Sequence, residues 1–257
     1  MCIRDSYHTR NLGMYGNSLA TNTATRGEYI ALLDGDDFWT SPEKLQRGVA
    51  ALDGHPDCSG SYHFVSVVDA VGNVIGSHPA REQAPTRVTF ADFLRSNNTP
   101  TGSVMFRRSC LPETIPPWAN GLGMIDWPAF LSLTSHGDFL LIDATLGAHR
   151  QHHASVWSRR DGLHIARSME EFHTRVCRQY PEATKDLRAE YRKGDAFLYI
   201  RAADAAGNAA LGRKYFLRYF FSRPRLFRAP PGQRGAVVRA FMPWIRRWLP
   251  YNATSTH

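Results

Sequence analysis

The feature that most constrains the fold is an apolar run that ends directly in a cluster of acids. Residues 29–33 are continuously apolar, a pattern typical of a strand covered on both faces. Residues 34–37 follow as Asp-Gly-Asp-Asp, and residues 40–43 then combine a capping hydroxyl, an early proline and an acid, as at the start of a helix. This order of strand, acidic loop and helix predicts an α/β protein with the acids at the carboxyl end of a strand.

Three zones are expected along the chain. Short β-type runs alternate with helical segments up to about residue 160, and from 164 to 222 apolar residues recur at helical spacing, which predicts two or three packed helices. Residues 223–257 are a Pro/Arg-rich linker and a basic tail. The further elements expected in the first zone are helices over 17–26 and 126–137, strands over 62–68, 103–106 and 139–142, and a turn at 71–74.

The positive charge is confined to the C-terminal third. The formal net charge is +8, yet residues 1–165 hold 13 Lys and Arg against 16 Asp and Glu, a net −3. Residues 166–257 hold 18 against 7, a net +11, and residues 223–257 contain seven arginines and no acid. Because the basic charge belongs to the tail rather than to the whole surface, no nucleic-acid partner is expected.

The cysteines and the lack of long apolar segments predict a cytoplasmic protein. Cys2, Cys58, Cys110 and Cys177 are far apart and form no C-x-x-C pair, which argues against a structural zinc site and a disulfide framework. The sequence has no run of about 18 apolar residues, and its first residues lack the apolar core of a secretion signal.

The tail supports a separate hypothesis of membrane contact. On a helix, Val237, Phe241, Trp244, Ile245 and Trp248 gather on one side with arginines mostly opposite, a pattern expected of a segment in the membrane interface. The tail over 233–257 is therefore expected to contact the inner face of the cell membrane peripherally. The alternative is a tail that packs back on the rest of the chain or is disordered.

The acidic loop is the main candidate for chemistry. Three carboxylates crowded at the end of a strand repel one another unless a proton or a cation intervenes. Mg²⁺ or Mn²⁺ suits such a loop, because it binds one or two carboxylates plus the oxygens of a substrate diphosphate, and Gly35 lets the backbone approach closely. A solvated turn has the same composition, so these four residues alone leave both interpretations open.

The surrounding residues resemble the family 2 glycosyltransferases with a GT-A fold. The segment similar to the family's D-x-D region comprises Asn11-Leu12-Gly13, Asn17, Asn22, Ala24, residues 27–37, Trp39, Pro42, Lys44 and Leu45. The resemblance continues in residues 103–108, in residues 124–127, and in an R-x-H-x-x-S pattern at Arg150, His152 and Ser155. It covers roughly residues 10–158.

The resemblance implies an α/β, GT-A-like (Rossmann-like) mixed sheet flanked by helices, partial at the N-terminus. Family members carry a strand and an acidic segment upstream of the asparagines, where this chain has about ten unlike residues. The chain is therefore expected to be N-terminally truncated, with an incomplete nucleoside pocket and no activity by itself. The expected domains are a partial glycosyltransferase domain over 1–160, a small helical extension over 161–222, and the linker and tail over 223–257.

Carried over residue by residue, the resemblance implies roles for the acids. Asp34 and Asp36 match the D-x-D pair, with Asp36 on a Mn²⁺ or Mg²⁺ that bridges the donor's diphosphate. Asp34, the other expected metal residue, would also hold the sugar or ribose, and Asp37 would support the loop. Asp126 matches the general base that removes the proton of the acceptor hydroxyl, although Ile125 replaces the acid that usually precedes it. A helix N-cap is the alternative role for Asp126.

Two residues near the end of the resemblance are expected to bind substrate. Arg150 suits phosphate oxygens, and His152 suits a metal or a phosphate, so both are expected at the diphosphate. A polar loop that closes the domain would use the same residues. His149 and His153 are expected to be surface residues.

Three classes of function remain. The first is an inverting, metal-dependent glycosyltransferase that moves a sugar from a nucleotide-diphosphate sugar to a hydroxyl of a glycan or lipid-linked acceptor, in cell-envelope polysaccharide or glycolipid synthesis. The second is a haloacid-dehalogenase-like phosphoryl-transfer enzyme, which Asp37-Phe38 and the near absence of lysine in the first 160 residues disfavour. The third is a non-catalytic partner that keeps a truncated GT-A fold.

Overall fold

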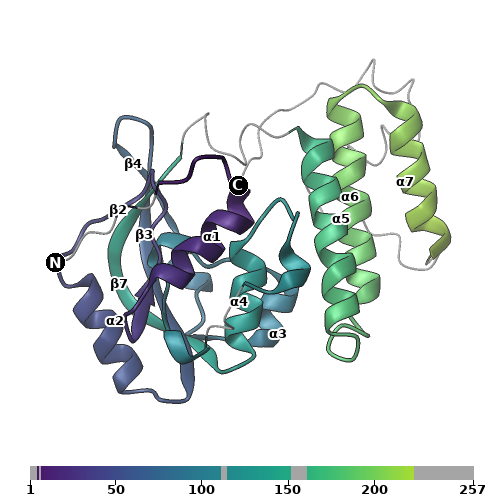
Figure 1. Cartoon of the computed structure of the whole chain (residues 1–257). Helices are drawn as coiled ribbons and strands as arrows, with labels where there is room; N and C mark the ends of the chain where they lie inside the picture. Colours follow the sequence, from purple (N-terminus) through teal and green to yellow (C-terminus); the bar gives the residue numbers. More distant parts are fainter. Residues whose placement is uncertain (1–4, 6, 111–114, 152–160, 223–257) are drawn as a thin grey trace. The chain divides into compact units, whose positions relative to one another are not determined.

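A computed structural model describes residues 5, 7–110, 115–151 and 161–222. The chain divides into two compact units, Met1–Ser155 and Val156–His257. The first unit is a mixed sheet with helices packed against it, and the described part of the second unit is helical (Figure 1). The α/β class expected from the sequence is therefore confirmed.

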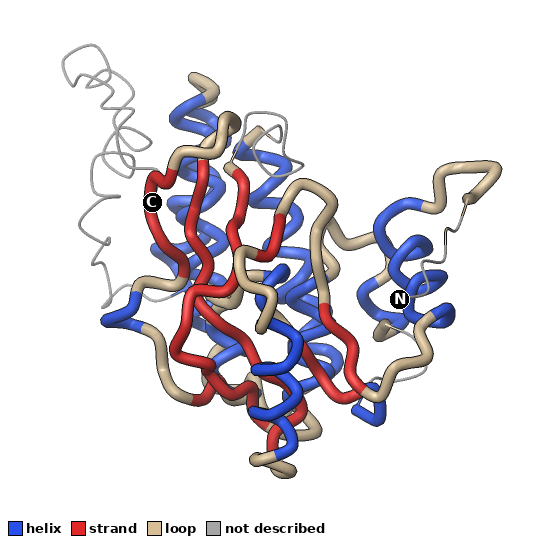
Figure 2. The backbone as a smooth tube through the Cα atoms, turned by 90° about the vertical axis from the view of Figure 1, so that its left-hand side faces the viewer, coloured by secondary structure: helices blue, strands red, loops and turns tan. Residues whose placement is uncertain are grey.

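The sheet of the first unit is built around one long central strand. In the order β1-β6-β3-β7-β2, β3 lies at the centre, with β4 added beside β3 and β5 beside β7. The β3–β7 pair is parallel and the other pairs are antiparallel. Figure 2 shows these strands as a curled red layer. Their bounds are β1 Tyr29–Ala31, β2 Phe38–Trp39, β3 Cys58–Val68, β4 Val74–His78, β5 Arg87–Val88, β6 Met105–Arg107 and β7 Asp138–Arg150.

Helices cover both faces of this sheet. Helix α2 packs closely on one face, where a Cβ at Gly48 would lie 2.6 Å from the Met105 sulfur. On the other face, Phe93 of α3, Phe130 of α4 and Phe139 of β7 form a fully buried aromatic cluster with ring centroids 5.4–5.7 Å apart. The helices of this unit are α1 Gly13–Ala24, α2 Lys44–Asp53, α3 Phe90–Arg95 and α4 Asp126–Thr134.

The apolar run at residues 29–33 is a shorter strand than expected. Within this run only the three residues of β1 are paired with β6, with Ile30 opposite Phe106 at the centre. The chain then continues into the acidic loop. Ile30 is 6% exposed, whereas Leu33 is 44% exposed, so the expected cover on both faces is wrong for the end of the run. Strand β6 begins at Met105, and beyond it the contact continues only through the Leu32 N–H, which donates to the Val104 carbonyl at 3.0 Å.

The strand expected at 139–142 is much longer than its apolar pattern. Strand β7 extends to Arg150 because its second half pairs with β3 and with β2, through which Ala148 lies opposite Phe38. The end of β7 is thereby brought next to the acidic loop. The turn expected at 71–74 is confirmed, since it joins β3 to β4 and Gly72 adopts a positive φ of 100°.

The second unit contains three helices among its described residues. The second and third of these helices pack through an apolar cluster of Ala196, Phe197, Ile200 and Phe216, and the first packs against the second, which confirms the expected helical packing. No helix among the described residues is long and apolar enough to cross a membrane. The expected amphipathic tail, 233–257, lies outside the described residues. The helices are α5 Gly162–Gln179, α6 Arg188–Ala205 and α7 Ala209–Ser222.

Candidate active site

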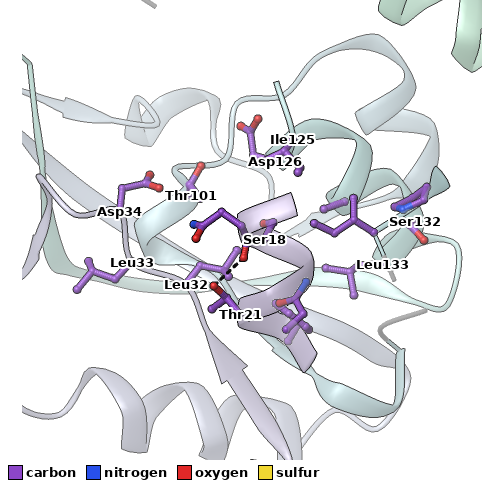
Figure 3. A pocket seen from close by; sticks show the side chains of 16 residues that line it. Ser18, Thr21, Leu32, Leu33, Asp34, Thr101, Ile125, Asp126, Ser132 and Leu133 are labelled. Atoms are coloured by element: carbon purple, nitrogen blue, oxygen red, sulfur yellow. Dashed lines mark hydrogen bonds between the residues drawn. The ribbon is translucent and has the colours of Figure 1, made fainter. Parts of the chain in front are cut away.

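A cavity of about 300 Å³ lies on the sheet face opposite α2, between α1, the end of β1 and the start of α4. Two of the predicted acids, Asp34 and Asp126, line it together with Thr101. In Figure 3 these three side chains follow one another along its edge. The polar side chains of α1 that line it are Asn17, Ser18, Thr21 and Asn22. The cavity therefore brings together acids from segments that are far apart in the sequence.

The acidic loop divides into two exposed acids and one buried acid. Asp34 and Asp36 are exposed residues, whereas the side chain of Asp37 is only 5% exposed. The Asp37 carboxylate accepts a hydrogen bond from the backbone N–H of Arg150 at 2.9 Å and lies 3.1 Å from Nδ1 of His149. Asp37 thus ties the acidic loop to the end of β7.

The negative charge of the acidic loop affects the pKa of Asp34. Partial burial raises the pKa of Asp34, and the negative charges of Asp37, Asp126 and Asp36 raise it further. The positive charge of His149 acts in the opposite direction. A cation placed at this loop would therefore be attracted by several carboxylates at once.

Asp126 is held at the first turn of α4. Helix α4 begins at Asp126 itself and Ile125 occupies the N-cap position, so the N-cap alternative is wrong. The amide nitrogen of Asn97 donates to Oδ2 of Asp126 at 3.0 Å. Burial raises the pKa of Asp126, while the backbone N–H groups of Trp127 and of Asp126 and the Asn97 amide act against this rise.

Arg150 is engaged with the backbone of two loops. Its guanidinium donates to the carbonyl oxygens of Asp36 at 3.3 Å, Asp69 at 3.3 Å and Ala70 at 3.1 Å. It also lies 5.5 Å from the ring centroid of Phe38. Arg150 therefore closes the loop after β3 against the acidic loop, the alternative that the sequence left open, and its guanidinium lies beside the predicted metal residue.

His149 was expected at the surface, and its side chain is 50% exposed, but it is also part of the acidic cluster. The hydrogen bond to Asp37 raises the pKa of His149 above its ordinary value. This contact follows from the full length of β7, which the four apolar residues at 139–142 did not predict. His152, the other expected diphosphate residue, lies outside the described residues.

The donor set fits a metal that relies partly on its substrate. Among the described residues, no three His, Cys, Asp or Glu side chains are grouped closely enough to hold a metal ion alone. Mg²⁺ and Mn²⁺ are typically held by one or two carboxylates together with phosphate oxygens. The exposed Asp34 and Asp36, with raised pKa at Asp34, are carboxylates of that kind.

Residues 2–111 match the family described as glycosyl transferase family 2. The match includes the acidic loop, β1, β3 and β6, and it covers less than half of the chain. The resemblance noted in the sequence is thus confirmed.

Two groups of relatives cover a longer stretch of the chain. An uncharacterized protein of Mycobacterium tuberculosis and one of Mycobacterium bovis are each 31% identical over 151 residues, which is 57% of this chain and 41% of each relative. An uncharacterized glycosyltransferase of a Nostoc species is 28% identical over 156 residues, 56% of this chain and 46% of that protein. The matched stretch thus spans less than half the length of these relatives.

Proposed function

We propose that this protein is a glycosyltransferase that moves a sugar from a nucleotide-diphosphate sugar to a hydroxyl acceptor with inversion at the anomeric carbon. The observation that carries the proposal is the shared cavity of Asp34, from the acidic loop, and Asp126, from the start of α4. An inverting displacement needs a base on one side of the anomeric carbon and a stabilised leaving group on the other. The match to glycosyl transferase family 2 supports the same reaction class.

The chemistry proposed for Asp126 is proton removal. The oxygen of the acceptor hydroxyl attacks the anomeric carbon, and the bond from that carbon to the diphosphate breaks with its electron pair remaining on the diphosphate. The hydroxyl proton passes to the Asp126 carboxylate, which lines the cavity. Burial raises the pKa of Asp126, which makes this carboxylate a stronger base than an exposed one.

The acidic loop is proposed to hold the donor. Asp36 and Asp34 would hold Mn²⁺ or Mg²⁺, which when bound would supply positive charge to stabilise the diphosphate leaving group. Asp34 would also hold a sugar or ribose hydroxyl, while Asp37 supports the loop through its bond to the Arg150 N–H. Arg150 and His152 are proposed at the diphosphate, and the contact of Arg150 with the Asp36 carbonyl favours this location for Arg150.

One observation argues further against phosphoryl transfer of the haloacid-dehalogenase type. That chemistry needs a lysine near the acids, and Lys44 is the only lysine in residues 1–155. Lys44 is 2% exposed, lies 4.3 Å from the ring centroid of Trp39, and is not among the residues that line the cavity.

The acceptor, the cellular location and the roles of the C-terminal segments are also proposals. The acceptor would be a glycan or a lipid-linked hydroxyl in cell-envelope polysaccharide or glycolipid synthesis, at the cytoplasmic face of the membrane. Residues 161–222 would serve as a helical extension of the transferase domain, and the tail over 233–257 would contact the membrane surface.

Release of nucleoside diphosphate from UDP- and GDP-sugars, measured with the full-length protein, tests the proposal. We expect donor hydrolysis with MnCl₂ that is lost in EDTA and restored by Mn²⁺. Asp36→Asn should abolish the metal dependence, and Asp126→Asn should lower the rate by roughly 100-fold or more. Glu82→Gln, which changes an exposed acid outside the cavity, is the matched control. Equal rates in Asp126→Asn and Glu82→Gln would contradict the assignment.

A further inference from the structure

Asn97 makes two hydrogen bonds that fix the direction of its side chain. The residue lies between α3 and the short 3₁₀ helix Thr101–Ser103. Its Oδ1 accepts from the backbone N–H of Thr99 at 3.2 Å, and its Nδ2 donates to Oδ2 of Asp126 at 3.0 Å. Because a carboxamide has one acceptor oxygen and one donor nitrogen, the bond from Thr99 obliges the nitrogen to face Asp126.

A second bond joins the same two segments. The indole N–H of Trp127, the residue after Asp126, donates to the carbonyl of Phe93 in α3 at 2.7 Å. The first turn of α4 is thus tied by two hydrogen bonds to α3 and to the segment that follows it. The segment continues to Gly102, where a Cβ would lie 3.4 Å from Oδ2 of Asp37 and whose carbonyl accepts from the Trp39 indole at 3.0 Å. Residues 97–102 therefore connect Asp126 to the acidic loop.

The hydrogen-bond donor to Asp126 is a neutral amide, and its lack of charge affects how basic the carboxylate is. Asp34 lines the same cavity as Asp126, Asp36 and Asp37 lie in the same loop as Asp34, and His149 contacts Asp37. Burial, nearby backbone N–H groups and the Asn97 amide are the main influences on the pKa of Asp126, whose own charge raises the pKa of Asp34. An amide N–H stabilises the carboxylate without adding the full positive charge of an arginine or lysine, which would weaken the base.

We propose that Asn97 is the positioning residue of Asp126, a neutral donor that holds one carboxylate oxygen and so fixes the orientation of the carboxylate at the cavity wall. This inference rests on the proposed function, in which Asp126 takes the proton of the acceptor. Asn97 acts on the reaction only through Asp126.

The sharpest test is the isosteric pair Asn97→Asp and Asn98→Asp. Asn97→Asp keeps an oxygen for the Thr99 N–H but replaces the donor to Asp126 by a second acceptor. Asn98 is the exposed next residue, so the control adds the same charge without facing Asp126. Titration of the Asp126 carboxyl carbon by NMR should show proton binding that is roughly tenfold tighter or more in Asn97→Asp, with less than a twofold change in Asn98→Asp.

The rate of donor hydrolysis supplies a second readout. Asn97→Asp should move the acidic limb of the kcat–pH profile upward, in step with the carboxyl titration, and should leave the KM for the donor unchanged. Asn97→Ala removes the donor without adding charge, so it should move both measurements in the same direction by a smaller amount. If circular dichroism shows that Asn97→Asp does not fold, the Asn97→Ala variant supplies the test instead.

The outcomes separate this inference from the proposed function, because the titration needs no substrate. Equal titration of Asp126 in the Asn97 variants, in the Asn98 variant and in the unaltered protein would overturn the positioning role. A shifted titration together with no donor hydrolysis by the unaltered protein would overturn the proposed function and support the contact. A shift in both measurements supports both.

Discussion

At the scale of single residues, the most unusual group outside the cavity is Lys44. It is 2% exposed, and no described residue accepts a hydrogen bond from its amine, which lies against the ring of Trp39. Burial lowers the pKa of Lys44 to about 8. His63, also buried, has its pKa lowered to about 4 by burial, with a further contribution from Lys44. The charge of Lys44 therefore disfavours the charged form of His63.

We expect Lys44→Met to stabilise the protein at pH 7 by about 2 kcal/mol, because it removes a buried ammonium that has no hydrogen-bond partner. The unfolded chain keeps the lysine proton up to the ordinary lysine pKa of 10.5, whereas the folded protein releases it at a pKa of about 8. The free energy of unfolding of the unaltered protein should therefore rise between pH 8 and 10.5. Urea unfolding of both proteins at about pH 7 and about pH 10 measures the stability gain of Lys44→Met and its pH dependence. A stability gain that is as large at about pH 10 as at about pH 7 would contradict this explanation.

The contact between His149 and Asp37 gives a second prediction at this scale. The hydrogen bond to Asp37 is the main reason for the raised pKa of His149, so Asp37→Asn should lower the His149 pKa toward its ordinary value. Any stability from this pair is present below the unfolded pKa and is lost as pH rises through the raised pKa. NMR titration of the imidazole measures the shift, with Asp57→Asn as the control at an exposed ion pair. An unchanged His149 titration in Asp37→Asn would exclude the contact.

At the scale of elements, glycines set how closely the layers of the first unit approach the central sheet. A Cβ at Gly60 of β3 would lie 2.7 Å from the Phe139 ring and 3.1 Å from the Met105 carbonyl. The neighbouring Ser61 lies opposite Met105, on the face covered by α2. One strand thus serves two packed layers on its alternating faces. The sequence pattern shows the strand but not the thickness of either layer.

Gly60→Ala should destabilise the protein by about 1–3 kcal/mol, because the added methyl group overlaps both a buried ring and a backbone atom. Gly194→Ala is the matched control, since this glycine lies within α6 and a Cβ there meets nothing within 4 Å. We expect the control to stabilise by up to ~1 kcal/mol through helix propensity. Thermal unfolding of the two variants should therefore shift in opposite directions, and equal shifts would contradict the packing.

At the scale of the whole molecule, the charge is divided between the two ends of the chain. The family match and the cavity lie in the acidic part, whereas the seven arginines of residues 223–257 lie at the other end. A protein that transfers sugar to a lipid-linked acceptor needs to be near the membrane surface. In the function proposed above, the arginines of the tail would attract anionic lipids independently of the proposed catalytic groups.

We expect liposome sedimentation to detect this attraction. Anionic vesicles should retain the full-length protein and lose most of it when residues 233–257 are deleted, at about 1 kcal/mol per arginine near the surface. Neutral phosphatidylcholine vesicles and added salt serve as controls, since screening weakens the contribution of exposed charges. Equal binding of the two proteins to anionic vesicles would contradict membrane contact through the tail.

Much of the first unit is predictable from local pattern. The turn at 71–74, the helix that begins near Asp126 and the strand within 62–68 all follow from residue types within a few positions of one another. The resemblance to family 2 glycosyltransferases, carried by the residues around the acidic loop, is confirmed by the family match. The errors concern strand length, at residues 29–33 and 139–142, because a strand ends where its partner ends.

The amino-acid sequence alone shows that three acids follow an apolar run and that this region resembles a known family of transferases. The folded structure is needed to show which groups come together: Asp34 and Asp126 in the lining of one cavity, His149 and Arg150 at Asp37, and Asn97 at Asp126. The physical reason is that periodicity and turn chemistry act between near neighbours in the chain. Contacts between distant segments depend on sheet register and on layer packing, which no local pattern specifies.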